Sequence, residues 1–151
     1  DFAGYDGPFA GLGQFREKWL THARENAKHP NRRNCDELKL CGLGKMLVVC
    51  VMGESLEEAI PIIKKYRDRC DVMACDKAFG VLLDNGIMPD FVQICDANIP
   101  SRWLEPYASR TEGVKLIATA YANVEWTRMW KGPIYFYLNR APGQPVELHL
   151  G

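Results

Sequence analysis

The stretch that decides the fold is Leu47-Val48-Val49-Cys50-Val51-Met52-Gly53-Glu54-Ser55-Leu56. Its six apolar residues, rich in Val and bounded by turn chemistry, predict a β-strand buried on both faces. Gly53 then allows a tight turn and a close approach of a ligand to the backbone. Ser55 and Glu58 have the Ser-x-x-Glu spacing of a capping box. The stretch therefore predicts a strand, a turn and the start of a helix.

The start of such a helix is a natural binding site for an anion, because its first backbone N–H groups are free and its dipole is positive there. The same pattern is equally typical of an ordinary turn between a strand and a helix that binds nothing. Both interpretations stay open at this point.

Four more apolar runs repeat the strand pattern along the chain, and helical patterns separate them. The expected strands are 47–52, 71–76, 91–96, 114–119 and 134–138, and the expected helices are 56–68, 77–85, 99–110 and 125–130. Strands that alternate with helices are typical of βαβ units. We therefore predict an α/β, Rossmann-like three-layer fold, with helices on both faces of a mainly parallel sheet of about five strands.

The residues ahead of the first strand differ in character from the rest. The first 13 residues hold four glycines and a proline, which predicts an extended arm. Phe15, Trp19 and Ala23 recur at helical spacing, which predicts a helix within 14–28 with Trp19 in the core. The predicted units are an N-terminal arm (1–13), a helix and linker (14–40) and a Rossmann-like domain (41–151).

Charge and cysteine content argue against several classes of protein. The 19 Lys and Arg balance 19 Asp and Glu, so the formal net charge of zero argues against a nucleic-acid polymer as partner. No apolar run approaches the ~20 residues of a membrane-spanning helix, so we expect no membrane insertion. The six cysteines lack Cys-x-x-Cys spacing, and Cys50, Cys75 and Cys95 are expected to be small buried residues. A reduced, cytoplasmic protein is therefore expected.

Polar residues follow the predicted strands, and in a parallel sheet ligands bind outside the carboxyl ends of the strands. The candidates are Gly53, Glu54, Ser55, Asp76, Asp96, Asn98, Thr119, Tyr121, Asn139 and Arg140. Asp76 is placed to bind ribose hydroxyls, although an acid there caps the next helix at least as often. Asp96 is expected to bind a ligand or metal or to act as a general base, since Asn98 and Pro100 already supply helix-start chemistry. Arg140 either pairs with a phosphate or lies in solvent.

Other catalytic patterns are weak or incomplete. The single Gly53 is not the Gly-x-Gly-x-x-Gly of a dinucleotide site, and Ser55 lacks the Gly-x-Ser-x-Gly elbow of a hydrolase. The three histidines are expected to lie away from the strand ends, so we assign none of them a catalytic role.

Several short motifs occur together in the order and spacing of one protein family. They are Met52-Gly53-Glu54-Ser55-Leu56, Ala74-Cys75-Asp76-Lys77-Ala78, Asn85-Gly86-Ile87-Met88-Pro89-Asp90, Ile94-Cys95-Asp96 and Trp130-Lys131-Gly132-Pro133. Over residues 15–140 the chain resembles the MptE-like family, which includes archaeal 6-hydroxymethylpterin diphosphokinases and the bacterial Maf flagellin glycosyltransferases. The resemblance implies a transferase domain that binds a nucleotide or nucleotide sugar.

Two features depart from the pattern of the family that the chain resembles. Its loop is usually Gly-Pro-Ser-Leu, and here Glu54 replaces the proline; a carboxylate there opposes a phosphate unless a metal or Lys offsets it. The family domain also continues beyond the point at which this chain stops, so the domain is expected to be incomplete at its C-terminus. These departures favour a catalytically inactive binding or assembly module as one alternative.

The end of the third predicted strand separates the two branches of the family. The diphosphokinase branch has an Asp-x-Asp pattern that holds Mg²⁺, whereas this chain has Asp96-Ala97-Asn98, a poorer Mg²⁺ site. We therefore favour a glycosyltransferase-like domain of the Maf type. In it the Gly53–Ser55 turn binds the phosphate, Asp76 the ribose or base, and Asp96 orients the acceptor or acts as base. Mg²⁺-dependent transfer of pyrophosphate from ATP to a hydroxymethyl group is the other enzymatic alternative.

Overall fold

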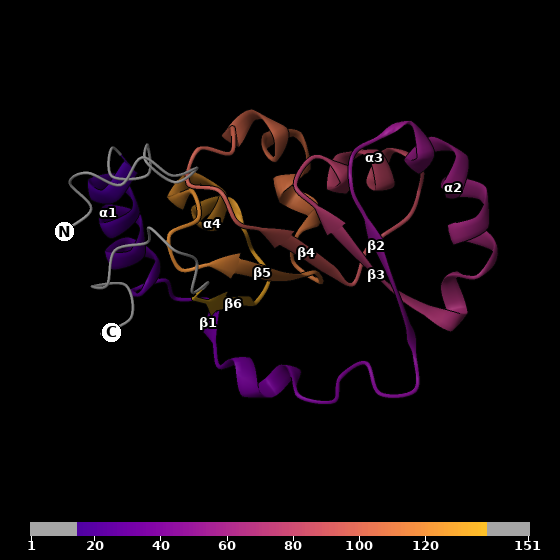
Figure 1. Cartoon of the computed structure of the whole chain (residues 1–151), viewed down its shortest axis with the longest axis horizontal. Helices are drawn as coiled ribbons and strands as arrows, with labels where there is room; N and C mark the ends of the chain where they lie inside the picture. The colour runs from indigo at the N-terminus through magenta and orange to yellow at the C-terminus, as the bar shows by residue number, and fades with distance from the viewer. Residues whose placement is uncertain (1–14, 139–151) are drawn as a thin grey trace, which may run out of the picture.

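The computed structural model describes residues 15–138, which form a six-stranded parallel sheet with helices packed against it (Figure 1). The strands are β1 (Arg32–Arg33), β2 (Met46–Cys50), β3 (Cys70–Cys75), β4 (Phe91–Ile94), β5 (Lys115–Thr119) and β6 (Ile134–Tyr137). The helices are α1 (Arg16–Asn26), α2 (Glu54–Lys65), α3 (Ala78–Asp84) and α4 (Val124–Met129). Short 3₁₀ helices are η2 (Cys35–Leu38), η3 (Arg67–Arg69), η4 (Ser101–Trp103) and η5 (Glu105–Arg110).

The α/β, Rossmann-like fold and all five predicted strands are confirmed, and a sixth strand joins them. The strand order is β1-β6-β5-β4-β3-β2, and every neighbouring pair is parallel. The added strand is β1, a two-residue pair of arginines with no apolar pattern that the sequence could reveal. It pairs with Ile134 and Tyr135 of β6 and forms one edge of the sheet.

One face of the sheet carries the main core. Side chains that alternate along the strands pack there, such as Val72 and Ala74 on β3 and Val92 and Ile94 on β4. Apolar residues of α2, α3 and α4 belong to the same cluster, so these three helices share this face. Right-handed crossovers require this arrangement, because β2 to β6 follow one another in one direction across the sheet.

None of the helices α2, α3 and α4 packs on the second face of the sheet. The chain between β1 and β2 instead runs along this side from one edge of the sheet to the other (Figure 1). The hydroxyl of Tyr135 donates a hydrogen bond of 3.3 Å to Glu37 of this segment. The second helical layer of the predicted three-layer fold is therefore not seen in the described part of the chain.

β2 is an edge strand, so the prediction that it is buried on both faces is wrong. Leu47 is 49% exposed and Val49 53% exposed, and only Cys50 of this strand is buried. A strand at the edge of a sheet has a neighbour on one side only, and here the second face lacks a covering helix. Hydrophobic patterning cannot distinguish such a strand from a central one.

Local details of three helices differ from the prediction. α2 begins at Glu54 with Gly53 as N-cap and no side-chain cap hydrogen bond, so the predicted capping box of Ser55 is wrong. The expected helix 99–110 is two 3₁₀ helices, because Pro106 has no N–H to continue an α-helix. The predicted C-terminal cap of α3 is confirmed, since Gly86 has φ +73°.

The cysteine prediction is confirmed in part. Cys50 is buried, Cys75 is half-buried and Cys95 is exposed, so the expectation of burial is wrong for Cys95. It lies one residue beyond the end of β4, where the sheet no longer covers it. All six cysteines are free thiols in the structure.

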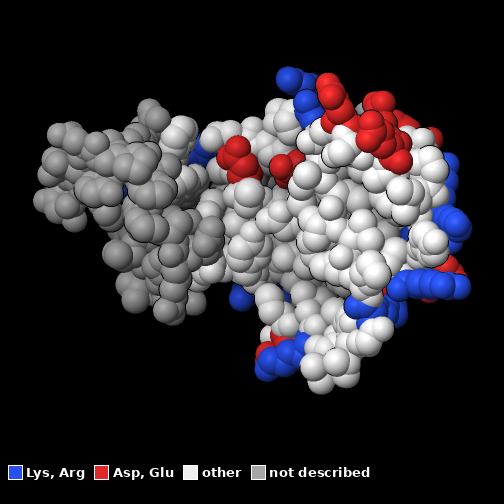
Figure 2. Space-filling model, turned by 45° about the vertical axis from the view of Figure 1, so that its right-hand side comes forward, with Lys and Arg blue, Asp and Glu red and all other residues white. Residues whose placement is uncertain are grey.

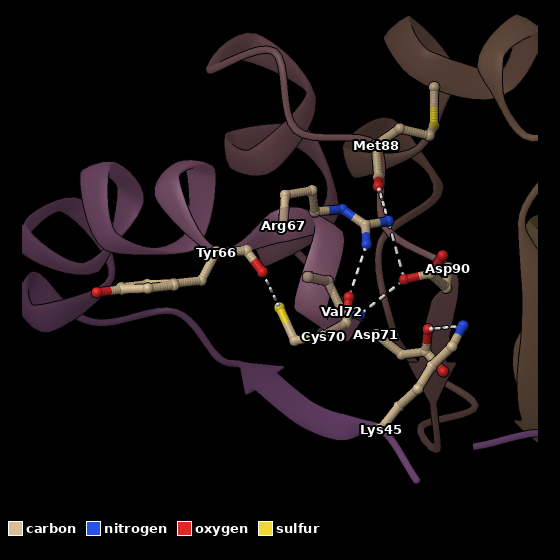
Figure 3. Close-up of polar contacts among 8 residues, drawn as sticks. All are labelled: Lys45, Tyr66, Arg67, Cys70, Asp71, Val72, Met88 and Asp90. Carbon is tan, nitrogen blue, oxygen red and sulfur yellow. Dashed lines mark hydrogen bonds and ion pairs between the residues drawn. The ribbon is translucent and has the colours of Figure 1, made fainter. Parts of the chain in front are cut away.

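An ion-pair network ties the amino-terminal ends of β3 and β4 together (Figure 3). Arg67 pairs with Asp90 at 2.9 Å and donates to the carbonyls of Cys70 and Met88 at 2.9 and 2.8 Å. The Asp90 carboxylate also accepts a hydrogen bond of 2.7 Å from the Val72 backbone. One side chain therefore connects η3, β3 and the turn that leads into β4.

We expect Arg67→Ala to lower the free energy of unfolding by roughly 1–3 kcal/mol, because it leaves a partly buried carboxylate without its positive partner and two carbonyls without the donor that Arg67 supplies. Lys45→Ala is the matched control. It removes the 3.1 Å pair with Asp71, in which the Lys45 side chain is 58% exposed, and should cost less than about 1 kcal/mol. Urea unfolding of both variants measures the difference, and equal losses would contradict the role given to Arg67.

The Trp-x-Gly-Pro segment has a structural role. Trp130 is 1% exposed and its indole N–H donates to the Val114 carbonyl at 3.1 Å. A Cβ atom on Gly132 would lie 2.4 Å from the carbonyl oxygen of Val114 and 2.6 Å from that of Thr111. Only glycine fits between these two backbone groups.

Gly132→Ala should therefore destabilise the fold by about 1–3 kcal/mol or more, since backbone has to move to accommodate the methyl group. Gly113→Ala is the control, because a Cβ atom there meets nothing within 4 Å. Thermal unfolding should show a lower Tm for the first variant and an unchanged or slightly higher Tm for the second.

Candidate functional site

Parallel pairing brings the predicted site residues to one edge of the sheet. The Asp76 and Asp96 carboxylates follow the neighbouring strands β3 and β4 and are close enough to raise the pKa of Asp76. Gly53 and Ser55 follow β2 at the start of α2, and Thr119 ends β5. Asn139 and Arg140 lie outside the described residues.

Asp76 is the most unusual residue at this edge. Its φ is +46°, a left-handed conformation that Asp tolerates better than most residues. Its backbone N–H donates to the Gln93 carbonyl at 3.2 Å, and its carbonyl accepts from Phe79 at 3.2 Å, which starts α3. The N-cap of α3 is Lys77, without a side-chain cap, so the alternative that Asp76 caps this helix with its carboxylate is wrong.

The Asp76 carboxylate lacks a protein partner for one of its oxygens. Oδ1 is buried and accepts no hydrogen bond from the described residues. Burial raises the pKa of Asp76, and the negative charge of Asp96 raises it further. Buried polar atoms are normally hydrogen-bonded, and each exception calls for an explanation. A ligand hydroxyl or N–H at this position would satisfy the oxygen.

The loop after β4 has a local structure of its own. Asp96 is exposed, and its Oδ1 accepts a hydrogen bond of 2.8 Å from the backbone N–H of Asn98. Asn98 caps no helix, because the N-cap of η4 is Pro100, so the helix-start role expected for it is wrong. Its Oδ1 accepts a hydrogen bond of 2.6 Å from the ammonium of Lys18, which lies on α1.

The oxygens at this edge do not fit Mg²⁺ well. Asp76 and Asp96 supply carboxylates, but the Asn98 oxygen is already bound by the Lys18 ammonium, and that positive charge repels a second cation. The described residues contain no group of three or more His, Cys, Asp or Glu side chains arranged to hold a metal ion.

The start of α2 is open but acidic. Gly53, Glu54 and Ser55 are exposed, and a Cβ atom on Gly53 would meet only the Ser55 hydroxyl, at 3.9 Å. Glu54 and Glu57 lie in the first turn of α2, and acidic side chains gather over this end of the molecule in Figure 2. They stabilise the helix through its dipole but oppose a phosphate at the same place.

Thr119 differs from Asp96 and Asn98 in being buried. It is fully buried, and its hydroxyl donates to the Cys95 carbonyl at 3.0 Å, which ties the end of β5 to the end of β4. Its hydroxyl therefore positions the loop that carries Asp96.

The sequence did not indicate that α1 lies beside the site. Trp19 is in the core as predicted, and its ring centroid is 5.1 Å from that of Tyr121, which follows β5. His22 lies next to the backbone of Tyr121, and burial lowers its pKa, so the expectation that it lies away from the strand ends is wrong. Only the apolar stripe of α1 could signal this contact, and a stripe does not say which partner it packs against.

Two hollows are lined in part by residues that follow the strands, although neither is lined by Asp76 or Asp96. One, of about 290 Å³, lies between α3 and the η4–η5 segment, and there the ammonium of Lys77 lies 4.2 Å from the centroid of the Trp103 ring. The other, of about 400 Å³, lies between α1 and the end of β6 and is lined by Arg24, Arg32 and Tyr137 among others. The larger is within the range of small-ligand sites, so each side of the edge offers space and positive charge.

The family model described as 6-hydroxymethylpterin diphosphokinase MptE-like matches residues 18–148. The chain belongs to this MptE-like family. An uncharacterized protein of Treponema pallidum (strain Nichols) is 43% identical over 44 residues, which cover 29% of this chain and 21% of that protein. The chain thus spans about a fifth of the length of this curated relative.

A solved structure, the Maf glycosyltransferase from Magnetospirillum magneticum AMB-1, is similar in fold. The two chains are 26% identical with a TM-score of 0.54, over 66% of this chain and 16% of the other. Together with the family match, this likeness supports a transferase-like domain of Rossmann-like architecture. In residues 15–138, no helix has the length and apolar character needed to cross a membrane.

We expect Asp76→Asn to raise the Tm at pH 7. The raised pKa of Asp76 means that its charged form is disfavoured in the fold, which costs stability at pH values above the ordinary pKa of Asp, about 4. The wild type should regain stability relative to the variant as the pH falls toward that value. Thermal unfolding between pH 7 and pH 4 measures this, with Asp68→Asn on exposed η3 as control. A variant that is less stable than the wild type at pH 7 would contradict the assignment.

Proposed function

We propose that this domain binds a nucleotide sugar at the carboxyl edge of its sheet and is part of a glycosyltransferase. The observation that carries the proposal is the Asp76 carboxylate, which is held beside Asp96 with one buried oxygen lacking a protein partner. Structural carboxylates are normally paired, whereas binding sites retain polar groups that a ligand completes. The likeness to a Maf glycosyltransferase supports the choice of reaction class.

In this proposal each site residue binds a different part of the ligand. Asp76 accepts hydrogen bonds from ribose hydroxyls or from an N–H of the base. Asp96 is exposed and orients the acceptor hydroxyl or removes its proton. The backbone of the Gly53–Ser55 turn meets the phosphate, and Lys77, which lines a hollow together with Met52, supplies a positive charge on this side of the site.

A diphosphokinase is the second candidate, favoured by the description of the family model. Transfer of pyrophosphate from ATP to a hydroxymethyl group needs Mg²⁺ to neutralise the phosphates. The Lys18–Asn98 contact weakens the fit for that ion, so we place this candidate second. The six free cysteines are consistent with a reducing cytoplasmic setting for either reaction.

A thermal-shift screen with CMP-, UDP- and GDP-sugars and ATP, each with and without Mg²⁺, tests the proposal. A bound ligand raises stability by about 2.7 kcal/mol at a hundredfold excess over its Kd. We expect a nucleotide sugar to raise the Tm without Mg²⁺ and Asp76→Ala to abolish the shift, while Asp68→Asn leaves it unchanged. A shift by ATP that needs Mg²⁺ would favour the diphosphokinase instead. No shift with any nucleotide would favour an inactive assembly module.

The role of Asp96 is tested separately from binding. We expect Asp96→Asn to retain most of the thermal shift with the nucleotide sugar and to lose sugar transfer by about 10²–10⁴-fold, the usual contribution of a general base. Transfer is measured by release of the free nucleotide in the presence of acceptor. Unchanged transfer would remove Asp96 from the mechanism while leaving the binding role of Asp76 intact.

A further inference from the structure

The outer edge of β2 carries an apolar surface that the proposed function does not use. Residues 46–52 contain no charged residue, and Met46, Leu47, Val49, Val51 and Met52 are 49–69% exposed. We call residues 46–52, which comprise β2 (Met46–Cys50) and the two residues after it, the β2 edge. No strand pairs with the outer side of β2 among residues 15–138. Figure 2 shows a broad surface without charged side chains on the side where α2 and β2 lie.

Exposed edges of this kind are normally protected against pairing with another chain. Natural sheets place lysine, proline, a bulge or an inward charge on an exposed edge strand. The β2 edge has none of these devices, and its backbone N–H and C=O groups face outward beside Val and Leu side chains, which favour strands. An unprotected edge in a folded domain indicates a pairing surface.

We propose that the β2 edge pairs antiparallel with the β2 edge of a second copy of this chain. Residues that lie directly opposite each other point to the same face, so the two-fold axis must pass through one residue position. Placing it at Val49 sets Val49 opposite its own copy, Leu47 opposite Val51 and Met46 opposite Met52. Every apolar residue of the edge then meets an apolar partner.

The charges that flank the edge fit the same register. Lys45 lies before the edge and Glu54 lies just after Gly53, so the two ends carry opposite charge. With the axis at Val49, Lys45 of one copy lies opposite Gly53 of the other and next to its Glu54. Shifting the axis by one residue leaves Met46 or Met52 without an apolar partner. Opposite charges at the two ends of an interface favour one orientation and register.

Exposed apolar side chains also lie in the segments on either side of the β2 edge in the sequence. Leu40 and Leu43, in the segment before β2, are 77% and 78% exposed, and Ile62 on α2 is 61% exposed. A two-fold pair would join the two sheets into one of twelve strands, since each copy has six.

Charge placed at the two-fold axis tests the proposal. We expect the full 151-residue chain to dimerise in sedimentation velocity at concentrations of about 1–100 µM. Val49→Lys or Val49→Glu should each raise the dimer dissociation constant by at least about 100-fold, because like charges then meet at the axis. An equimolar mixture of the two variants should form a heterodimer, because opposite charges now face each other.

Two controls keep the result interpretable. Met88→Lys changes an exposed residue in the turn that leads into β4 and should leave the dimer unchanged, and circular dichroism should show that all variants are folded. A wild-type chain that is monomeric throughout this range would overturn the proposal and indicate a different polypeptide as the occupant of the edge. Open-ended oligomers, or a dimer that both Val49 variants retain, would overturn it as well.

Discussion

Parallel pairing in a single direction from β2 to β6 is the constraint on which the rest of the molecule depends. Because each right-handed crossover returns to the next strand along, α2, α3 and α4 lie on one face and bury the same set of alternating side chains. The same pairing aligns the carboxyl ends of all strands. The acids after β3 and β4 therefore become neighbours, although 20 positions separate Asp76 from Asp96 in the sequence.

The sequence could predict the features that depend on local pattern. Apolar runs and the residues that end them identified five strands and placed Asp76 and Asp96 at the same edge of the sheet. It could not predict whether a strand lies at the centre or at an edge, since Val49 has the same neighbours in sequence in both cases. It also could not predict that Lys18 would reach Asn98, because a contact across 80 residues leaves no local pattern. Tertiary packing decides the position of a strand in the sheet and the contact between Lys18 and Asn98.

The carboxyl ends of the strands hold polar groups that lower the stability of the fold, whereas the polar groups at the amino-terminal ends stabilise it. At the amino-terminal ends, Arg67 and Asp90 satisfy each other and the neighbouring carbonyls. At the carboxyl ends, Asp76 has a left-handed backbone, a raised pKa and a buried oxygen without a partner. Strained and unsatisfied groups persist where function requires them. The contrast between the two ends of the strands marks the carboxyl ends as the candidate site without reference to any relative.

Lys18 brings a positive charge to the loop after β4, at a sheet edge where Asp76, Asp96 and Glu54 are negative. A site with Asp76, Asp96 and Glu54 needs positive charge to accept a phosphate, and the two available sources are a metal ion and a basic side chain. α1 delivers a lysine to the Asn98 oxygen, the position at which an Asp-x-Asp pattern would supply its second carboxylate. An amide that is bound by an ammonium makes this position more positive than a second carboxylate would, and so disfavours a divalent cation there.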